Sequence, residues 1–142
     1  MSTRNDADMI QVQTVVNAPI NKVWSLWTEA EHIKNWCSAS DDWHAPAAEN
    51  DLRVGGSFKT VMAAKDGSMQ FDFGGEYTAV TPGEFLEYYM GDGRKVDVKF
   101  TPRGNAVEII ERFDAETTHP REMQQQGWQA ILENFKKYVE SN

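Results

Sequence analysis

The last sixteen residues, 127–142, constrain the fold of this chain more than any other segment. Their apolar side chains recur three and four positions apart, with polar residues between them. The apolar set is Trp128, Ile131, Leu132, Phe135, Tyr138 and Val139. This spacing is typical of an amphipathic helix that buries one face against a core. Gly127 costs roughly 1 kcal/mol relative to alanine inside a helix, so a close contact, a kink or a helix start is expected there.

Residues 57–114 show the alternation of strands. Five short runs place apolar residues at every second position, with charged residues between them, which predicts a sheet with one buried and one wet face. Glycine- and proline-containing turns separate the runs, at 55–56, 65–67, 81–83, 91–93 and 103–105. These turns favour an antiparallel meander. Gly74 and Gly75, inside the second run, predict a bulge or a sharp bend that lets the sheet curl.

The N-terminal part predicts one more strand, at residues 9–16, followed by two short helices. Pro19 suits the first turn of the first helix, whose apolar residues follow at helical spacing. Thr28 and Glu31 match a capping box, which predicts that a second helix starts there and runs toward Trp36.

Two further segments show no regular pattern. Residues 37–50 are expected to form a long loop that carries Trp43, and residues 1–8 are expected to be flexible. After Asp114, a polar loop with Pro120 leads into the closing helix. The expected fold class is therefore α+β: a strand, two short helices, five strands and a long helix, with a curved antiparallel sheet of about six strands wrapped around that helix.

Composition limits the possible functions. A chain of 142 residues is expected to form a single domain, 1–142. The net charge of −8 and the lack of a basic cluster argue against a nucleic-acid partner. The single Cys37 cannot form an internal disulfide, and no apolar leader or membrane-spanning run is visible. A cytoplasmic location and no membrane insertion are expected.

Four segments carry a resemblance to a known family. They are NAPINKVW at 17–24, LWTEAEHIKNW at 26–36, DLRVGGSF at 51–58 and GWQAILENF at 127–135. Together they resemble the bacterial family named after the activator of the Hsp90 ATPase. This family is part of the START-like, or Bet v 1-like (SRPBCC), superfamily, and the resemblance implies a helix-grip fold with a ligand cavity. Where many members have a further aromatic residue after Trp36, this chain has Cys37 and Ser38. That difference affects the expected shape of the cavity mouth.

Metal and covalent chemistry have little support in the sequence. His32, His44 and His119 are far apart, and none lies at metal-ligand spacing from another ligand-type residue, so neither a metal nor a cofactor is expected. Cys37 lacks a recognisable partner that would lower its pKa, and no catalytic residue is assigned. The run from Asp41 to His44 either places acid and base groups at the cavity mouth or is a solvated loop.

Glu111 is the most unusual residue of the strand region. If Phe113 faces the core, Glu111 two residues earlier faces it too. An inward carboxylate is costly unless it is paired. Glu111 is therefore expected either to be a polar anchor inside the cavity or to lie at its open end.

The expected function is binding of a small apolar or amphipathic molecule between the sheet and the closing helix. The alternatives are an enzyme of the cyclase, dehydratase or hydrolase type that uses the same cavity, and a chaperone-associated or stress-response role. A homodimer formed through an exposed strand edge or through the apolar loop is also compatible with the sequence. The candidate cavity residues are Trp36, Trp43, Phe58, Met62, Phe71, Phe73, Tyr88, Met90, Phe100, Glu111, Phe113, Trp128 and Leu132.

Overall fold

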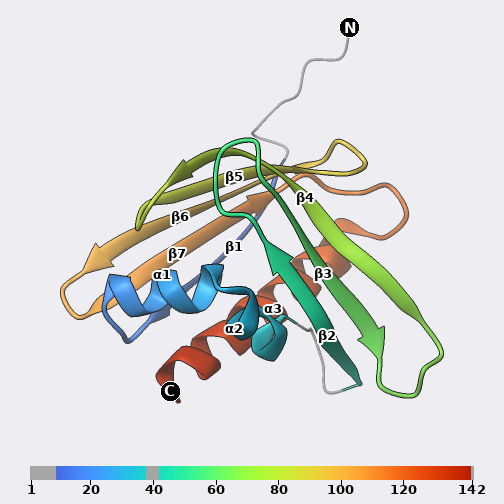
Figure 1. Cartoon of the computed structure of the whole chain (residues 1–142), viewed down its shortest axis with the longest axis horizontal. Coiled ribbons are helices and arrows are strands. Elements are labelled where there is room, and N and C mark those ends of the chain that lie inside the picture. The colour runs from blue at the N-terminus through green and yellow to red at the C-terminus, as the bar shows by residue number, and fades with distance from the viewer. Residues whose placement is uncertain (1–8, 38–41, 142) are drawn as a thin grey trace, which may run out of the picture.

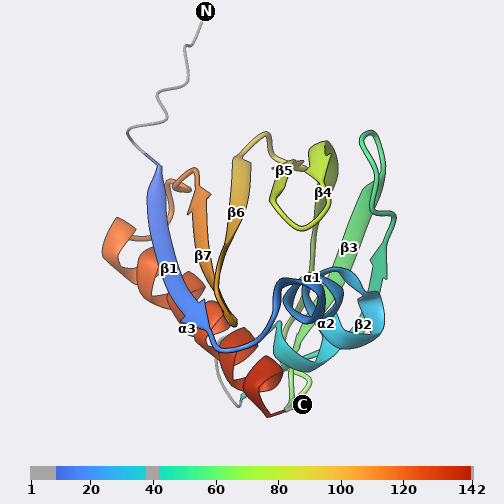
Figure 2. The ribbon, with the colours of Figure 1, turned by 90° about the vertical axis from the view of Figure 1, so that its left-hand side faces the viewer.

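The computed structural model describes residues 9–37 and 42–141. A seven-stranded antiparallel sheet, in the order β1-β7-β6-β5-β4-β3-β2, curls around one long helix (Figures 1 and 2). Its strands are β1 (Ile10–Val16), β2 (Trp43–Asn50), β3 (Ser57–Ala64), β4 (Gln70–Thr81), β5 (Phe85–Met90), β6 (Lys95–Arg103) and β7 (Ala106–Phe113). The helices are α1 (Ile20–Thr28), α2 (Ala30–Trp36) and α3 (Arg121–Glu140). The predicted α+β helix-grip class is confirmed, with one strand more than expected.

The core lies between the concave face of the sheet and the three helices. Helix α3 runs beside β1 and β7, whereas α1 and α2 lie across one end of the curled sheet (Figure 2). Along β7, every second residue is buried, and its inward positions are Val107, Ile109, Glu111 and Phe113. Three of these side chains are apolar, so Glu111 occupies a place that the strand pattern otherwise gives to the core. No helix in the described part of the chain is long and apolar enough to cross a membrane.

The predicted loop at 37–50 is wrong for its second half, which forms the edge strand β2. Its pairing with β3 shifts register between His44 and Ala47, around Pro46. Proline has no amide hydrogen to give to a ladder and is tolerated at an edge strand or a bulge. Hydrogen bonds to β3 therefore hold residues 43–50 as a strand, although their sequence lacks the alternation of apolar and polar residues that is typical of strands.

The predicted capping box is also wrong. The Thr28 hydroxyl donates to the backbone oxygen of Trp24, one turn earlier, at 2.7 Å. Glu29 precedes α2 instead, and its side chain makes no capping hydrogen bond. Only Glu29 separates the two helices, so the chain turns before Thr28 can adopt the extended conformation that a capping residue needs.

Gly74 and Gly75 do not mark a bulge, because both pair in register with β3; the irregularity on β4 lies between Tyr77 and Ala79, opposite β5. A Cβ on Gly74 would lie 2.5 Å from the backbone oxygen of Phe58, and one on Gly75 equally close to that of Tyr89. Close approach of the neighbouring strands therefore requires glycine at both positions.

Helix α3 begins at Arg121, six residues before the predicted stretch, so Gly127 lies inside it. A Cβ on Gly127 would have nothing within 4 Å. Neither a close contact nor a helix start accounts for this glycine. Residues 1–8, expected to be flexible, lie outside the described residues.

Candidate functional site

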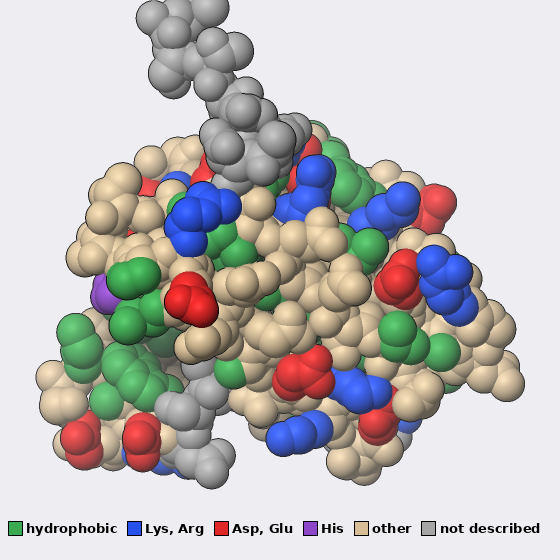
Figure 3. Space-filling model, turned by 180° about the vertical axis from the view of Figure 1, so that it is seen from behind, with side chains coloured by type: hydrophobic (Ala, Val, Ile, Leu, Met, Phe, Trp, Pro, Cys, Tyr) green, Lys and Arg blue, Asp and Glu red, His purple; other side chains and the backbone are tan. Residues whose placement is uncertain are grey.

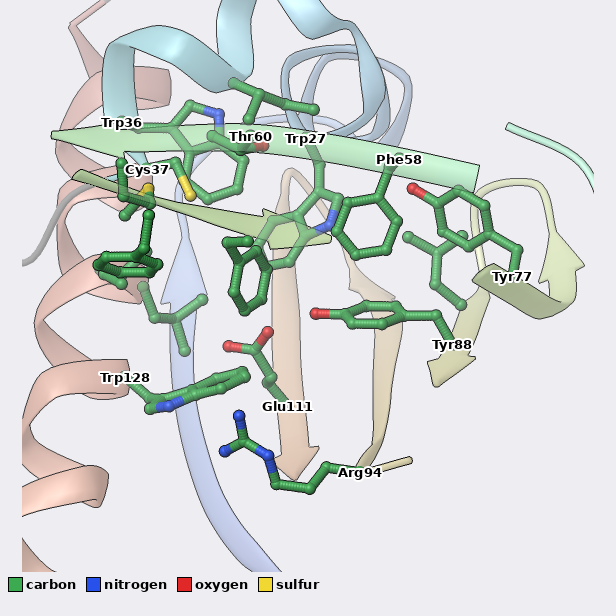
Figure 4. A pocket seen from close by; sticks show the side chains of 17 residues that line it. Trp27, Trp36, Cys37, Phe58, Thr60, Tyr77, Tyr88, Arg94, Glu111 and Trp128 are labelled. Atoms are coloured by element: carbon green, nitrogen blue, oxygen red, sulfur yellow. The ribbon is translucent and has the colours of Figure 1, made fainter. Parts of the chain in front are cut away.

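A cavity of about 290 Å³ lies between the sheet and helices α2 and α3 (Figure 4). Aromatic side chains dominate its wall, and the polar ones are few. The lining residues are Trp27, Ile33, Trp36, Cys37, Phe58, Thr60, Met62, Phe71, Phe73, Tyr77, Leu86, Tyr88, Arg94, Glu111, Trp128, Ile131 and Leu132. Protein interiors rarely keep voids much larger than a water molecule, so a space of this size is an unusual feature of the core.

Contacts between rings hold the cavity wall in shape. Trp128 of α3 stacks on Phe113 of β7, with ring centres 3.9 Å apart. On the opposite wall, Phe58 of β3 meets Tyr88 of β5 edge to face at 4.7 Å. Such contacts fix ring positions, so the cavity is bounded by packed side chains.

Phe71 differs from the other wall residues because it is 50% exposed. Seen from behind, hydrophobic side chains also gather at one end of the surface (Figure 3).

Glu111 enters this cavity from β7, the strand next to the edge strand β1. It pairs across the strands with Val12 of β1 and Val98 of β6, and its side chain is only 7% exposed. No hydrogen bond or ion pair to its carboxyl group is found among the described residues. Burial, and secondarily the nearby Asp97, raises the pKa of Glu111 to about 8. At neutral pH the group is therefore mainly a neutral carboxylic acid.

Asp97 does not share this situation, although it lies on the neighbouring strand. It faces the other side of the sheet, and Arg112 donates two hydrogen bonds to its carboxylate, at 3.0 and 2.8 Å. Its two oxygens are therefore satisfied by a guanidinium, in a pair of charge-assisted hydrogen bonds. Of the two acids, Glu111 alone lines the cavity.

Tyr88 supplies the second polar group of the cavity, and its hydroxyl points toward Glu111 (Figure 4). Burial raises its pKa well above 10, and the nearby Glu111 adds to that effect. Tyr77, in the same wall, donates instead to the side-chain oxygen of Asn50 at 2.7 Å. Burial likewise raises the pKa of Cys37 to about 12, so its thiol is not a nucleophile at neutral pH.

Nine of the thirteen residues proposed from the sequence line this cavity. They are Trp36, Phe58, Met62, Phe71, Phe73, Tyr88, Glu111, Trp128 and Leu132. The other four are Trp43, Met90, Phe100 and Phe113, and each packs elsewhere. Trp43 lies against the outer rim residue Phe71, and Phe100 lies under Trp24 and Trp27 of α1. Phe113 is covered by the Trp128 ring, and Met90 is buried in the core.

Eight lining residues were not proposed from the sequence. They are Trp27, Ile33, Cys37, Thr60, Tyr77, Leu86, Arg94 and Ile131. Trp27 and Ile131 lie on the apolar faces of their helices, and Thr60 shares its inward parity with Phe58 and Met62, so strand and helix periodicity is a usable signal for them. Arg94 lies in the turn before β6, where no periodicity applies.

The other polar candidates lie outside the cavity. Asp42 and His44 are exposed and do not line it, and Asp41, like Ser38, is outside the described residues. His32 shares a 2.6 Å hydrogen bond with Tyr138, and His119 contacts Glu116. Within residues 9–37 and 42–141, no group of three potential metal ligands comes together.

Comparison with known proteins gives a consistent result. A family model described as activator of Hsp90 ATPase homolog 1-like protein matches residues 17–140. An AHSA1-like protein from Aeromonas hydrophila is 44% identical, with 93% of each chain covered and a TM-score of 0.85. A Cytophaga hutchinsonii protein is 56% identical over 95% of this chain and 94% of its own, with a TM-score of 0.82.

A Chromobacterium violaceum protein shares the fold, with a TM-score of 0.84 at 22% identity, over 96% of this chain and 99% of its own. No curated protein matches the chain.

Proposed function

Because this chain belongs to the activator of Hsp90 ATPase homolog 1-like family, whose fold is known for binding hydrophobic ligands in a cavity, we propose that it binds a small apolar or amphipathic molecule between the sheet and α3. The observation that carries this proposal is the 290 Å³ cavity with an aromatic wall. Ligand pockets typically start near this volume. A void left only by imperfect packing would reduce the stability of the protein and serve no purpose.

The size of the cavity also limits the affinity. A ligand that buries about 300 Å² of apolar surface gains roughly 7 kcal/mol from leaving water. Association costs back at least about 4 kcal/mol. Burial alone therefore gives weak binding, and a tighter complex needs polar contacts inside the cavity.

The test fills the cavity and measures binding of N-phenyl-1-naphthylamine, a neutral apolar dye whose fluorescence rises in apolar surroundings. Thr60→Phe places a ring in the cavity, whereas Thr78→Phe makes the same change on an exposed position of β4. Wild type and Thr78→Phe should bind the dye with equal affinity, and Thr60→Phe should lose at least tenfold. Equal binding by both variants, or none by the wild type, contradicts the proposal.

An enzyme of the cyclase or dehydratase type is the second candidate. One observation favours it: Glu111, with a pKa of about 8, faces the same cavity as Tyr88. A general acid or base works best when its pKa lies near the operating pH. Turnover of a bound carbonyl compound that Glu111→Gln abolishes without weakening binding is the result that this candidate requires. A chaperone-associated role rests on the family description alone, and recovery of a chaperone in a pull-down is its test.

A further inference from the structure

Two oxygen-bearing side chains converge inside a cavity that is otherwise largely apolar. Glu111 reaches it from β7 and Tyr88 from β5, with β6 lying between these strands. Figure 4 shows the Tyr88 hydroxyl and the Glu111 carboxyl facing each other across open space, with Trp128 beside them. The phenol and the carboxyl are not hydrogen-bonded to each other.

Both groups also lack other hydrogen-bond partners among the described residues. Among the same described residues, no side-chain oxygen or nitrogen is both inaccessible to solvent and without a hydrogen-bond partner. The oxygens of Glu111 and Tyr88 must therefore reach the cavity space. Buried polar groups are normally paired, so this arrangement indicates that a bound molecule supplies the missing acceptor.

Their surroundings keep both groups protonated at neutral pH. Burial is the main cause of the raised pKa of each, about 8 for Glu111 and well above 10 for Tyr88. The titratable neighbours in the wall, Cys37 and Tyr77, also have pKa values raised to about 12 and stay neutral. Asp97 faces away from the cavity and is paired with Arg112.

The remaining charged group of the lining is Arg94. Its guanidinium is engaged by Asp92, with nitrogen and oxygen 2.7 Å apart, and it does not form an ion pair with Glu111. The cavity therefore presents two neutral O–H donors, and the cation of its lining, Arg94, already has a carboxylate partner in Asp92.

We propose that Glu111 and Tyr88 form a two-donor site for a carbonyl oxygen, and that the ligand of this cavity is a compact apolar ketone or aldehyde. This inference rests on the proposed binding function and names the ligand class. A carbonyl oxygen has two lone pairs and accepts from both groups at once, while the rest of the molecule fills the aromatic space. An ammonium group brings only donors. A carboxylate would have to compete with Asp92 for Arg94, the cation of the lining.

The experiment uses three bicyclic probes of nearly equal shape: tetralin, 1-tetralone and 1-aminotetralin. Isothermal titration calorimetry with the full chain at pH 7 should show that 1-tetralone binds about tenfold or more tightly than tetralin, because each hydrogen bond contributes about three- to tenfold. 1-Aminotetralin should bind less tightly than 1-tetralone. Equal affinity of tetralin and 1-tetralone overturns the inference but leaves the proposed function standing. Failure of all three probes to bind overturns both.

Matched variants locate the two donors. Tyr88→Phe and Glu111→Met should each reduce the preference for 1-tetralone over tetralin by about three- to tenfold. Tyr89→Phe removes the neighbouring phenol of β5, which faces the other side of the sheet and does not line the cavity, and should leave the preference unchanged. Glu111→Gln keeps a donor and should keep most of the preference. A preference that survives Tyr88→Phe and Glu111→Met together overturns the inference.

Two measurements on the wild type do not depend on the folding of any variant. Affinity for 1-tetralone should fall as the pH rises through about 8, where Glu111 loses its donor proton, and Glu111→Gln should lack this step. The infrared carbonyl stretch of bound 1-tetralone should lie below its value in hexane, as two donors polarise the bond. A flat pH profile together with a hexane-like stretch overturns the inference.

Discussion

The apolar stripe of α3 has two halves, residues 128–132 and 135–139, which do different work although both place apolar residues at helical spacing. In the C-terminal half, the fully buried Phe135 packs against Trp27 of α1 and Trp36 of α2, with each pair of ring centres 4.8 Å apart. In the N-terminal half, Trp128 and Ile131 are only half-buried and face the cavity. Where α3 packs on α1 and α2, the core is closed. Where α3 lies over the curved sheet, the cavity remains. The same amphipathic face therefore makes a structural seam at one end and a ligand wall at the other.

The largest expected effect tests the C-terminal half of the stripe, where the core is closed. Phe135→Ala removes a fully buried ring between two tryptophans, so the free energy of unfolding should fall by about 3–5 kcal/mol. Urea denaturation followed by circular dichroism measures this loss. A decrease under about 1.5 kcal/mol would mean that the seam is no better packed than the cavity wall.

The cavity side of the comparison can be tested through Glu111, because its buried carboxyl group makes the stability of the protein depend on pH. Its pKa is raised from 4.5 in the unfolded chain to about 8 in the folded protein, so the folded state holds more protons between these values. Its favourable contribution is complete below about pH 4.5 and is lost as the pH rises toward 8, at about 1.4 kcal/mol per pH unit.

The variant Glu111→Gln should remove this slope. Relative to wild type, its free energy of unfolding should be higher at pH 8 than at pH 5 by about 3 kcal/mol. Urea denaturation of both proteins at the two pH values gives the difference. Glu108→Gln, at an acid on the outer face of the same strand that pairs with Arg103, is the control and should not reproduce this difference. Parallel pH profiles of wild type and Glu111→Gln would show that the carboxyl is not desolvated.

Trp128→Ala compares the cavity side of the stripe directly with Phe135→Ala. Trp128 loses its stacking contact with Phe113 but already borders empty space, so the expected decrease in the free energy of unfolding is about 2 kcal/mol. Dye affinity should fall as well, since one wall of the cavity is removed. A loss as large as that of Phe135→Ala, with dye binding intact, would erase the distinction between the two halves.

Gly127→Ala is the smallest of these changes. The glycine lies inside α3, and the added methyl group meets nothing within 4 Å. Thermal and urea unfolding should show a gain of about 0.5–1 kcal/mol, with unchanged dye affinity. A loss of stability would indicate that the helix needs flexibility directly before Trp128, where the cavity wall begins.

Local patterns predicted a large part of this architecture. The spacing of Trp128, Leu132 and Phe135 predicted the long helix, and the alternation around Phe58 and Tyr88 predicted strands with their inward residues. The parity of β7 also predicted that Glu111 faces inward, which the burial of its side chain confirms. These successes depend on the repeat of the backbone itself, 3.6 residues in a helix and two in a strand.

The capping-box error is local: Thr28 bonds back to Trp24, one turn earlier in its own helix, because the chain turns at Glu29. The other errors arose where distant segments meet. Residues 43–50 form a strand because β3 offers them hydrogen bonds. Likewise, Phe113 and Trp128 are far apart in sequence, and their stacking removes Phe113 from the cavity surface. Periodicity carries no information about such partners.

Periodicity in the chain is sufficient to specify an amphipathic helix, an alternating sheet and an acid on the buried face of β7. The space that this acid faces, its meeting with Tyr88 and the division of α3 into a packed half and a lining half all depend on how far the curved sheet stands from the helix. That separation is set by contacts between residues distant in sequence, among them the ring pairs of Phe135 and Trp128 and the close strand approach at Gly74 and Gly75. Backbone periodicity is a property of neighbouring residues, whereas a cavity is a property of surfaces that come together only in the folded protein.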